Sequence, residues 1–253
     1  IGVRVSEAGF DPFERDDGLH GVGPDGRYDP TVPRYNAYLN DKGYAGANPW
    51  HDWANAAEPE GNRLASGWAM RHAPKPARVA EDDSETPYMT RRAMDFITEA
   101  GDRPWCLHLS YIKPHWPYIA PEPYASMFAA SDVQPAIRSE IERDGAHPVF
   151  AAYMNMRYSK NMSRDDAREK VIPAYMGLIK QIDDQMGVLM GFLEAQGLLK
   201  QIEDYRHTLP VCSRCDTVIE PLLSEQWFLS MPEVARMTRE AIEGDDPPVA
   251  FVP

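Results

Sequence analysis

The stretch that decides the fold is residues 103–124, which read RPWCLHLSYIKPHWPYIAPEPY. Within it, residues 105–111 (WCLHLSY) form a short apolar run next to prolines, and this pattern favours a buried strand. Pro114 and Pro117 cannot continue a central strand, because proline has no amide hydrogen to donate to the ladder. We therefore predict a strand that ends in a rigid loop over residues 112–118.

A helix is expected directly before this strand. Ser84 or Thr86 can cap its N-terminus, and Pro87 suits its first turn. The residues that share its apolar face are Met89, Ala93, Phe96 and Ile97. The turn residues 101–104 (GDRP) end the helix. Helix, turn and strand in this order make one αβ step of a layered domain, so the predicted fold class is α/β.

The clearest helical pattern lies further along the chain, over residues 171–199. Its apolar stripe consists of Ile172, Tyr175, Met176, Ile179, Ile182, Met186, Leu189, Met190 and Leu193. Shorter helices are also predicted, at residues 33–42, 135–143 and 232–242. Residues 43–67 contain many turn residues and exposed aromatics, so we expect a long irregular loop there, and such loops are often functional.

The loop after the predicted strand carries the candidate chemistry. Lys113 and His115 lie two residues apart between two prolines, and such a pair can hold an anionic ester oxygen. A histidine can also protonate a leaving group, because its usual pKa lies near neutrality. The alternative is that His115 only forms a hydrogen bond with the backbone of a tight loop.

Residues 103–124 resemble the sulfatase family of the alkaline phosphatase superfamily, whose members carry a similar strand followed by a K/R-P-H-x-P-[YF] loop. Residues 85–97 and 175–198 resemble the same family and follow in the family's order. The phosphonate monoester hydrolase branch is the most similar. The resemblance covers residues 1–201 and implies a partial alkaline-phosphatase-like layered domain that hydrolyses sulfate or phosphonate esters.

This resemblance assigns roles to individual residues. It implies that His115 contacts the sulfate or phosphoryl group of a small anionic ester, with Lys113 as the second candidate. It also implies that Trp50, His51 and Trp53 line the mouth of the substrate site. The alternative for those three residues is a surface loop with its own small aromatic cluster.

The family's nucleophile and metal ligands are not recognisable in this sequence. The nucleophile is a cysteine or serine in a C/S-x-P-S/A-R motif, which does not occur here. The family's divalent metal (Ca, Mn or Mg) is held by two pairs of residues, and neither pair is found in its expected context. Asp183 and Asp184 are interpreted as structural carboxylates of the long helix. Because the chemistry needs both nucleophile and metal, we expect the chain alone to be inactive.

Residues 207–228 (HTLPVCSRCDTVIEPLLSEQWF) resemble a different family, the valyl-tRNA synthetases. In that context Cys212 and Cys215 would be half of a zinc site. Tetrahedral zinc needs four ligands, and His207 is the one obvious further candidate. We therefore predict a small unrelated C-terminal appendage over residues 202–253, joined to the sulfatase-like part, and interpret both chain ends as cuts through something longer.

Composition narrows the remaining alternatives. Acidic residues outnumber basic ones 39 to 26, giving a net charge of -13 that argues against a nucleic-acid surface. Three cysteines provide no disulfide framework, so a cytoplasmic setting is expected, and no stretch resembles a signal segment or a membrane span. Three hypotheses remain: a hydrolase fragment, a tRNA-ligase fragment, and an inert chimera of two reading frames.

Overall fold

The computed structural model describes residues 9, 12, 14, 34–139, 143–206, 208, 209, 211, 236, 237, 239 and 240. The chain divides into two compact units, Ile1–Lys200 and Gln201–Pro253. In the second unit, the four described residues of the predicted helix at 232–242 are helical, and Arg236 Nη1 donates a 2.5 Å hydrogen bond to Glu240 Oε1. Within the described ranges, no helix is long and apolar enough to cross a membrane.

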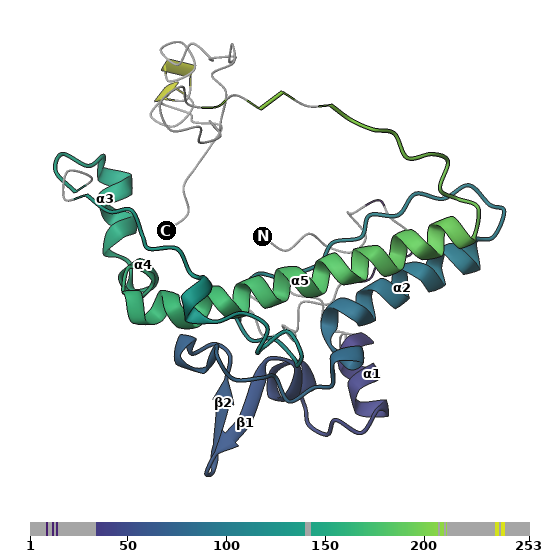
Figure 1. Ribbon diagram of the computed structural model, residues 1–253, viewed down its shortest axis with the longest axis horizontal. Coiled ribbons are helices and arrows are strands. Elements are labelled where there is room, and N and C mark those ends of the chain that lie inside the picture. The colour runs from purple at the N-terminus through teal and green to yellow at the C-terminus, as the bar shows by residue number, and fades with distance from the viewer. Residues whose placement is uncertain are drawn as a thin grey trace. The chain divides into compact units, whose positions relative to one another are not determined.

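The first unit is mainly helical (Figure 1). Its α-helices are α1 (Arg34–Asp41), α2 (Glu85–Ala100), α3 (Pro148–Asn155), α4 (Arg157–Met162) and α5 (Asp165–Ala195). Its strands, β1 (Ala56–Glu60) and β2 (Arg63–Ser66), pair as an antiparallel hairpin. Short helical turns are η2 (Trp50–Ala54), η3 (Met70–His72), η4 (Glu81–Asp83) and η5 (Ala130–Asp132). Gly61 stands at the hairpin turn with a φ of 63°, a conformation that favours glycine.

Helices α1 and α2 confirm the two predictions made for these segments. Ser84 is the N-cap residue of α2, and Gly101, with a φ of 56°, follows its last turn. The ring of Tyr88 on α2 packs against Tyr35 and Tyr38 of α1, with ring centroids 4.9 and 5.0 Å apart. Ser84 Oγ donates to Glu81 O at 2.7 Å and makes no side-chain cap bond to the helix. Apolar spacing and turn residues therefore located both helices correctly.

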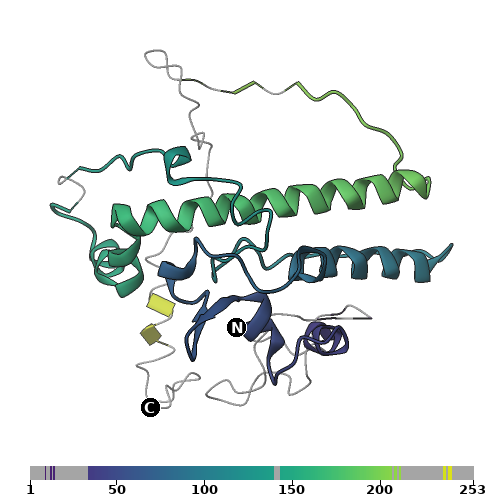
Figure 2. The same ribbon diagram turned by 60° about the horizontal axis from the view of Figure 1, so that its bottom comes forward.

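Helix α5 begins six residues before its predicted start and includes Pro173. Figures 1 and 2 both show α2 and α5 lying side by side. The side of α5 that is buried contains Val171, Ala174, Gly177, Leu178 and Gln181. Gly177 permits a very close approach, because a Cβ there would lie 2.2 Å from the carbonyl oxygen of Tyr124.

The predicted apolar stripe of α5 is not the side that is buried. Tyr175, Ile179, Met186 and Met190 share one face and are 39 to 54% exposed. The stripe is adjacent to the buried side on the helical surface, and periodicity alone does not say which of two neighbouring faces is covered. Periodicity therefore located the stripe but did not identify the side of α5 that is buried.

Three expectations were wrong. Residues 105–111 are extended and mostly exposed, without a paired strand among the described residues, because a strand needs a hydrogen-bonded neighbour. Residues 135–139 are not helical, and residues 140–142 lie outside the described ranges. The expected loop at 43–67 contains the hairpin, and helices α3 and α4 were not predicted.

One hydrophobic core joins α1, η2, the hairpin and the start of α2 to the segment after the predicted loop. Its buried members are Tyr35, Leu39, Trp50, Ala54, Ala57, Ala65, Ala77, Val79, Tyr88 and Ile119. Backbone hydrogen bonds fasten the same region: Ala77 N donates to Ala120 O at 2.8 Å, and Arg78 N donates to Ala56 O at 2.9 Å. This core fixes the loop at residues 113–118 against the hairpin.

Candidate functional site

The loop at residues 113–118 is held from below by a buried lysine. Lys113 is only 7% exposed, and its Nζ donates to Asn55 Oδ1 at 2.6 Å and to Pro117 O at 2.8 Å. The first bond joins the loop to the residue after η2, and the second closes the loop on itself. In addition, His115 N donates to Ile112 O at 3.0 Å. The loop therefore has a defined shape within this chain.

Burial also changes the pKa of Lys113. Desolvation lowers its pKa to about 8, and the charge of the buried carboxylate of Glu85 acts in the opposite direction. Its ammonium group already makes two short hydrogen bonds inside the fold. The structure therefore places Lys113 beneath the loop as a support, and direct contact with an ester stays a prediction.

His115 lies on the outer surface of the same loop. Its side chain is exposed, and its Nδ1 is 2.6 Å from the carbonyl oxygen of Trp116. A carbonyl oxygen only accepts hydrogen bonds, so Nδ1 carries the hydrogen in this contact. Nε2 is then the ring nitrogen that can contact a substrate. The backbone bond expected under the alternative interpretation is present, and it orients the ring. In its protonated form, Nε2 can donate to an anionic oxygen or to a leaving group.

Aromatic rings form a row beside His115. The ring of Trp116 packs against Trp68 at 4.9 Å and against Tyr158 at 5.1 Å, and Trp68 packs against Trp50 at 6.3 Å between centroids. Trp50 is buried at the inner end, whereas Trp68 is 37% exposed. Sequence reasoning missed Trp68 and Tyr158, which are distant from the loop along the chain.

The other predicted residues of the substrate mouth are arranged differently. Trp53 belongs to a separate cluster, in which Arg78 stacks over its ring at 3.7 Å and Tyr44 lies 5.4 Å away. His51 is hydrogen-bonded to Asp52 and Ser66. Trp50, His51 and Trp53 therefore have different contact partners, and their role in substrate binding stays a prediction.

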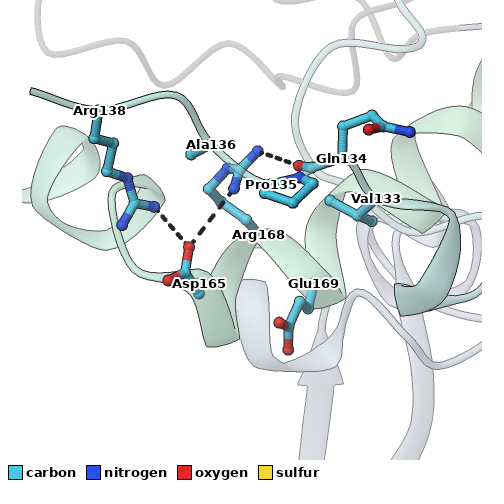
Figure 3. A pocket seen from close by; sticks show the side chains of 8 residues that line it. All are labelled: Val133, Gln134, Pro135, Ala136, Arg138, Asp165, Arg168 and Glu169. Carbon is cyan, nitrogen blue, oxygen red and sulfur yellow. Dashed lines mark hydrogen bonds and ion pairs between the residues drawn. The ribbon is translucent and has the colours of Figure 1, made fainter.

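A recess of about 290 Å³ lies between residues 133–138 and the start of α5 (Figure 3). Arg138 and Arg168 both point toward Asp165, at 2.7 and 3.6 Å, and Arg168 also donates to Gln134 O at 3.2 Å. One carboxylate thus pairs with two guanidinium groups, and the carboxylate of Glu169 also lines the recess. None of the predicted site residues lines this recess.

The described residues do not fit a metal site. Within the ranges that the structure describes, no three His, Cys, Asp or Glu side chains come together to hold an ion. Asp184 accepts hydrogen bonds from Tyr124 Oη at 2.9 Å and from Lys180, and Asp183 is 3.6 Å from Lys180. These contacts agree with structural carboxylates. His207, Cys212 and Cys215 lie outside the described residues.

Comparison with known families assigns most of the chain. The family model described as Sulfatase matches residues 20–202 of the 253 residues. The chain belongs to the sulfatase family. Members of this family generally use a divalent metal. The loop that carries His115 and the helices α1 to α5 all fall within the matched region.

Individual relatives agree with this assignment. The multifunctional alkaline phosphatase superfamily protein PehA of Trinickia caryophylli is 27% identical over 194 residues, covering 72% of this chain and 36% of PehA. The phosphonate monoester hydrolases of Silicibacter pomeroyi and Agrobacterium radiobacter are similar in fold, with TM-scores of 0.53 and 0.54. They are 23% and 20% identical, and each comparison covers 65% of this chain and 33% of the hydrolase. The chain thus spans about a third of these relatives' length.

The second resemblance is also confirmed for part of the chain. Valine–tRNA ligase of Thermotoga maritima is 39% identical over 94 residues, which cover 37% of this chain and 9% of the ligase. The ligase of Fervidobacterium nodosum is 49% identical over 61 residues, covering 24% of this chain and 7% of the ligase. A sulfatase-family region and a ligase-like segment therefore occur in one chain.

Proposed function

We propose that residues 1–201 are part of a metal-dependent hydrolase of sulfate or phosphonate monoesters, in which His115 contacts the ester group. The observation that carries this proposal is the loop geometry within the family-matched region. His115 is exposed and oriented by Trp116 O, while Lys113 and Asn55 hold the loop from inside. Preorganised donors of this kind can stabilise the charge of a transferring group.

In this proposal His115 acts through Nε2. With Nδ1 bonded to Trp116 O, a protonated ring donates from Nε2 to a non-bridging oxygen or to the leaving oxygen. The described residues do not provide a set of metal ligands. In this proposal the nucleophile and the metal ligands come from the part of the relatives' length that this chain does not span, and the chain alone does not turn over substrate.

Two exposed apolar surfaces support the idea of a larger domain. Residues 105–111 are extended and mostly exposed, and one face of α5 presents Tyr175, Ile179, Met186 and Met190 to solvent. Exposed apolar surface marks a place where further structure can pack. Additional strands beside residues 105–111 would cover both surfaces and complete an α/β sheet.

The test is complementation. The chain would be coexpressed with the non-overlapping parts of the Silicibacter pomeroyi phosphonate monoester hydrolase, and hydrolysis of a phenylphosphonate monoester and a phenyl sulfate would be measured. We expect turnover that needs both polypeptides and a divalent metal, with kcat/KM lowered about 100-fold by His115→Ala. A stable complex without turnover, or an active one indifferent to His115→Ala, would refute the proposal.

A second candidate function rests on the valine–tRNA ligase matches. If the segment at residues 202–253 acts as in a ligase, the chain should bind a valyl-adenylate analogue or tRNA, and calorimetry showing no heat would exclude this.

The third hypothesis, an inert chimera, is tested by a long DNA read across the codons for residues 199–207. A hydrolase frame that continues past this point would identify the junction as an artefact.

A further inference from the structure

A serine, a histidine and an aspartate lie in line beside the hairpin. Ser66 is the last residue of β2, and its Oγ is 3.3 Å from Nε2 of His51 in η2. On the other side of the ring, Nδ1 of His51 is 2.9 Å from Oδ1 of Asp52. The chain therefore connects a hydroxyl, an imidazole and a carboxylate by two successive hydrogen bonds.

The hydrogen-bonding partners fix the direction of both bonds. A carboxylate only accepts, so Nδ1–H of His51 donates to Asp52. In the neutral ring, Nε2 is then an acceptor, and the Ser66 hydroxyl donates to it. This is the arrangement in which a histidine removes the proton of a serine nucleophile while an acidic residue orients the ring.

Other contacts hold Ser66 in place and favour charge on its oxygen. The backbone N–H of Trp68 donates to Ser66 Oγ at 3.3 Å, which stabilises negative charge that develops there. The Ser66 carbonyl accepts from His72 Nδ1 at 2.7 Å and from Ala69 N at 3.1 Å. The serine is thus positioned by its own backbone as well as by His51.

The Ser66–His51–Asp52 site is partly exposed to solvent and lies next to aromatic rings. The side chains of His51 and Asp52 are 32% and 39% exposed. Trp68, two residues after Ser66, is 37% exposed and packs between the rings of Trp50 and Trp116. An exposed indole beside a nucleophile favours ligands that carry an aryl group, because aromatic pairs attract beyond simple burial.

We propose that Ser66, His51 and Asp52 form a nucleophilic site that accepts an acyl group from small aryl esters. As Ser66 Oγ bonds to the carbonyl carbon, its proton passes to His51 Nε2. The bond from that carbon to the aryloxy oxygen breaks, and His51 returns the proton to the departing phenol. Water, deprotonated by His51, then releases the acid and restores Ser66. This activity does not depend on the proposed metal-dependent hydrolysis.

The test begins with the unmodified full chain. It would be incubated with diisopropyl fluorophosphate, which phosphorylates activated serines with loss of fluoride, and then analysed by intact and peptide mass spectrometry. We expect one adduct, on Ser66, and slow release of p-nitrophenol from p-nitrophenyl acetate. Absence of a Ser66 adduct under conditions that saturate a known serine hydrolase overturns the proposal.

Variants distinguish labelling of Ser66 that depends on activation by His51 from labelling that depends only on exposure of the serine. His51→Gln should lower the labelling rate about 100-fold, the scale of a general-base contribution, and Asp52→Asn should also lower it. The matched control is Ser126→Ala, because Ser126 is exposed and bonded to Glu122 Oε2 at 2.8 Å but is not paired with a histidine. Labelling that survives Ser66→Ala, or is unchanged in both His51→Gln and Asp52→Asn, contradicts the site.

Discussion

The buried residues under the His115 loop find their partners within this chain, whereas the apolar face of α5 is exposed. Beneath the loop, Lys113, Asn55 and Glu85 are buried, and the lysine makes two hydrogen bonds shorter than 3 Å. On α5, by contrast, Ile179 and Met186 are 44% and 54% exposed although both belong to the apolar stripe predicted from the sequence. The loop is therefore built by this chain, whereas the α5 face still has room for a partner surface.

The two regions correspond to two requirements of the family's function, which are substrate recognition and hydrolysis. A substrate-contacting loop can be shaped by local packing over residues 50–125, and that region lies within the described structure. The sheet that a layered domain needs is not formed by residues 105–111 alone, because each strand depends on a neighbour. We propose that this loop is sufficient to recognise the ester, whereas hydrolysis requires the rest of a layered domain.

The largest effect is expected beneath the loop. Lys113→Met removes a buried cation and leaves Asn55 Oδ1, Pro117 O and the charge of Glu85 without it. We expect a loss of about 4 kcal/mol in the free energy of unfolding, because two buried acceptors lose their donor and the nearby charge of Glu85 loses an opposite charge. Urea denaturation measures this. The control Lys160→Met, at an exposed residue, should change stability by under about 0.5 kcal/mol.

Neighbouring residues on α5 provide the next comparison. Leu178 is 1% exposed and packs with Ala120, Tyr124 and Ala125, whereas Ile179 is 44% exposed. Leu178→Ala should cost about 3 kcal/mol through lost burial and a cavity, and Ile179→Ala about 1 kcal/mol or less. Thermal and urea unfolding of the two variants measures both losses of stability. Equal losses would show that the exposed face is already covered in solution.

Two glycines of α5 distinguish a tight contact from an open one. A Cβ at Gly177 would lie 2.2 Å from Tyr124 O, whereas at Gly187 nothing lies within 4 Å. Gly177→Ala should therefore destabilise the fold by about 2 kcal/mol through overpacking. Gly187→Ala should stabilise it by up to about 1 kcal/mol, because alanine favours helix. Two shifts of the same sign would contradict the packing of α5 against residue 124.

The last prediction concerns pH. The pKa of Lys113 is lowered from 10.5 to about 8 by burial, so between these values the unfolded chain binds more protons than the folded one. Stability from this residue therefore increases as pH rises from about 8 to 10, by at most ~1.4 kcal/mol per pH unit. The measured quantity is the difference in unfolding free energy between wild type and Lys113→Met at several pH values. A difference independent of pH would show that Lys113 titrates normally.

Much of the local structure could be predicted from the sequence, because its causes are local. Ser84 and Gly101 stand at the two ends of α2, and the prolines of the loop at 113–118 exclude a central strand. The family resemblance, carried by a contiguous motif, was also accessible. The hairpin was missed because residues 56–66 lack a clear alternating pattern and were dominated by turn signals.

The remaining features depend on contacts between residues far apart in the chain. Lys113 is buried because Asn55, 58 residues earlier, provides an acceptor, and no local pattern contains that information. The bond between His51 and Ser66 depends in the same way on the hairpin. Periodicity located the apolar stripe of α5, but only the arrangement of neighbouring segments decides whether it is covered.

The most direct test of the account is a titration of the full chain with a phenylphosphonate monoester, followed through the histidine ring resonances in NMR. The His115 signal would be assigned by its loss in His115→Gln, and His108, which is exposed outside the loop, serves as the internal control. We predict a saturable shift of the His115 resonance at millimolar ester, with the His108 resonance unmoved. Saturation without a His115 shift, or equal shifts at both histidines, would contradict the claim that this chain carries a preformed ester-binding loop.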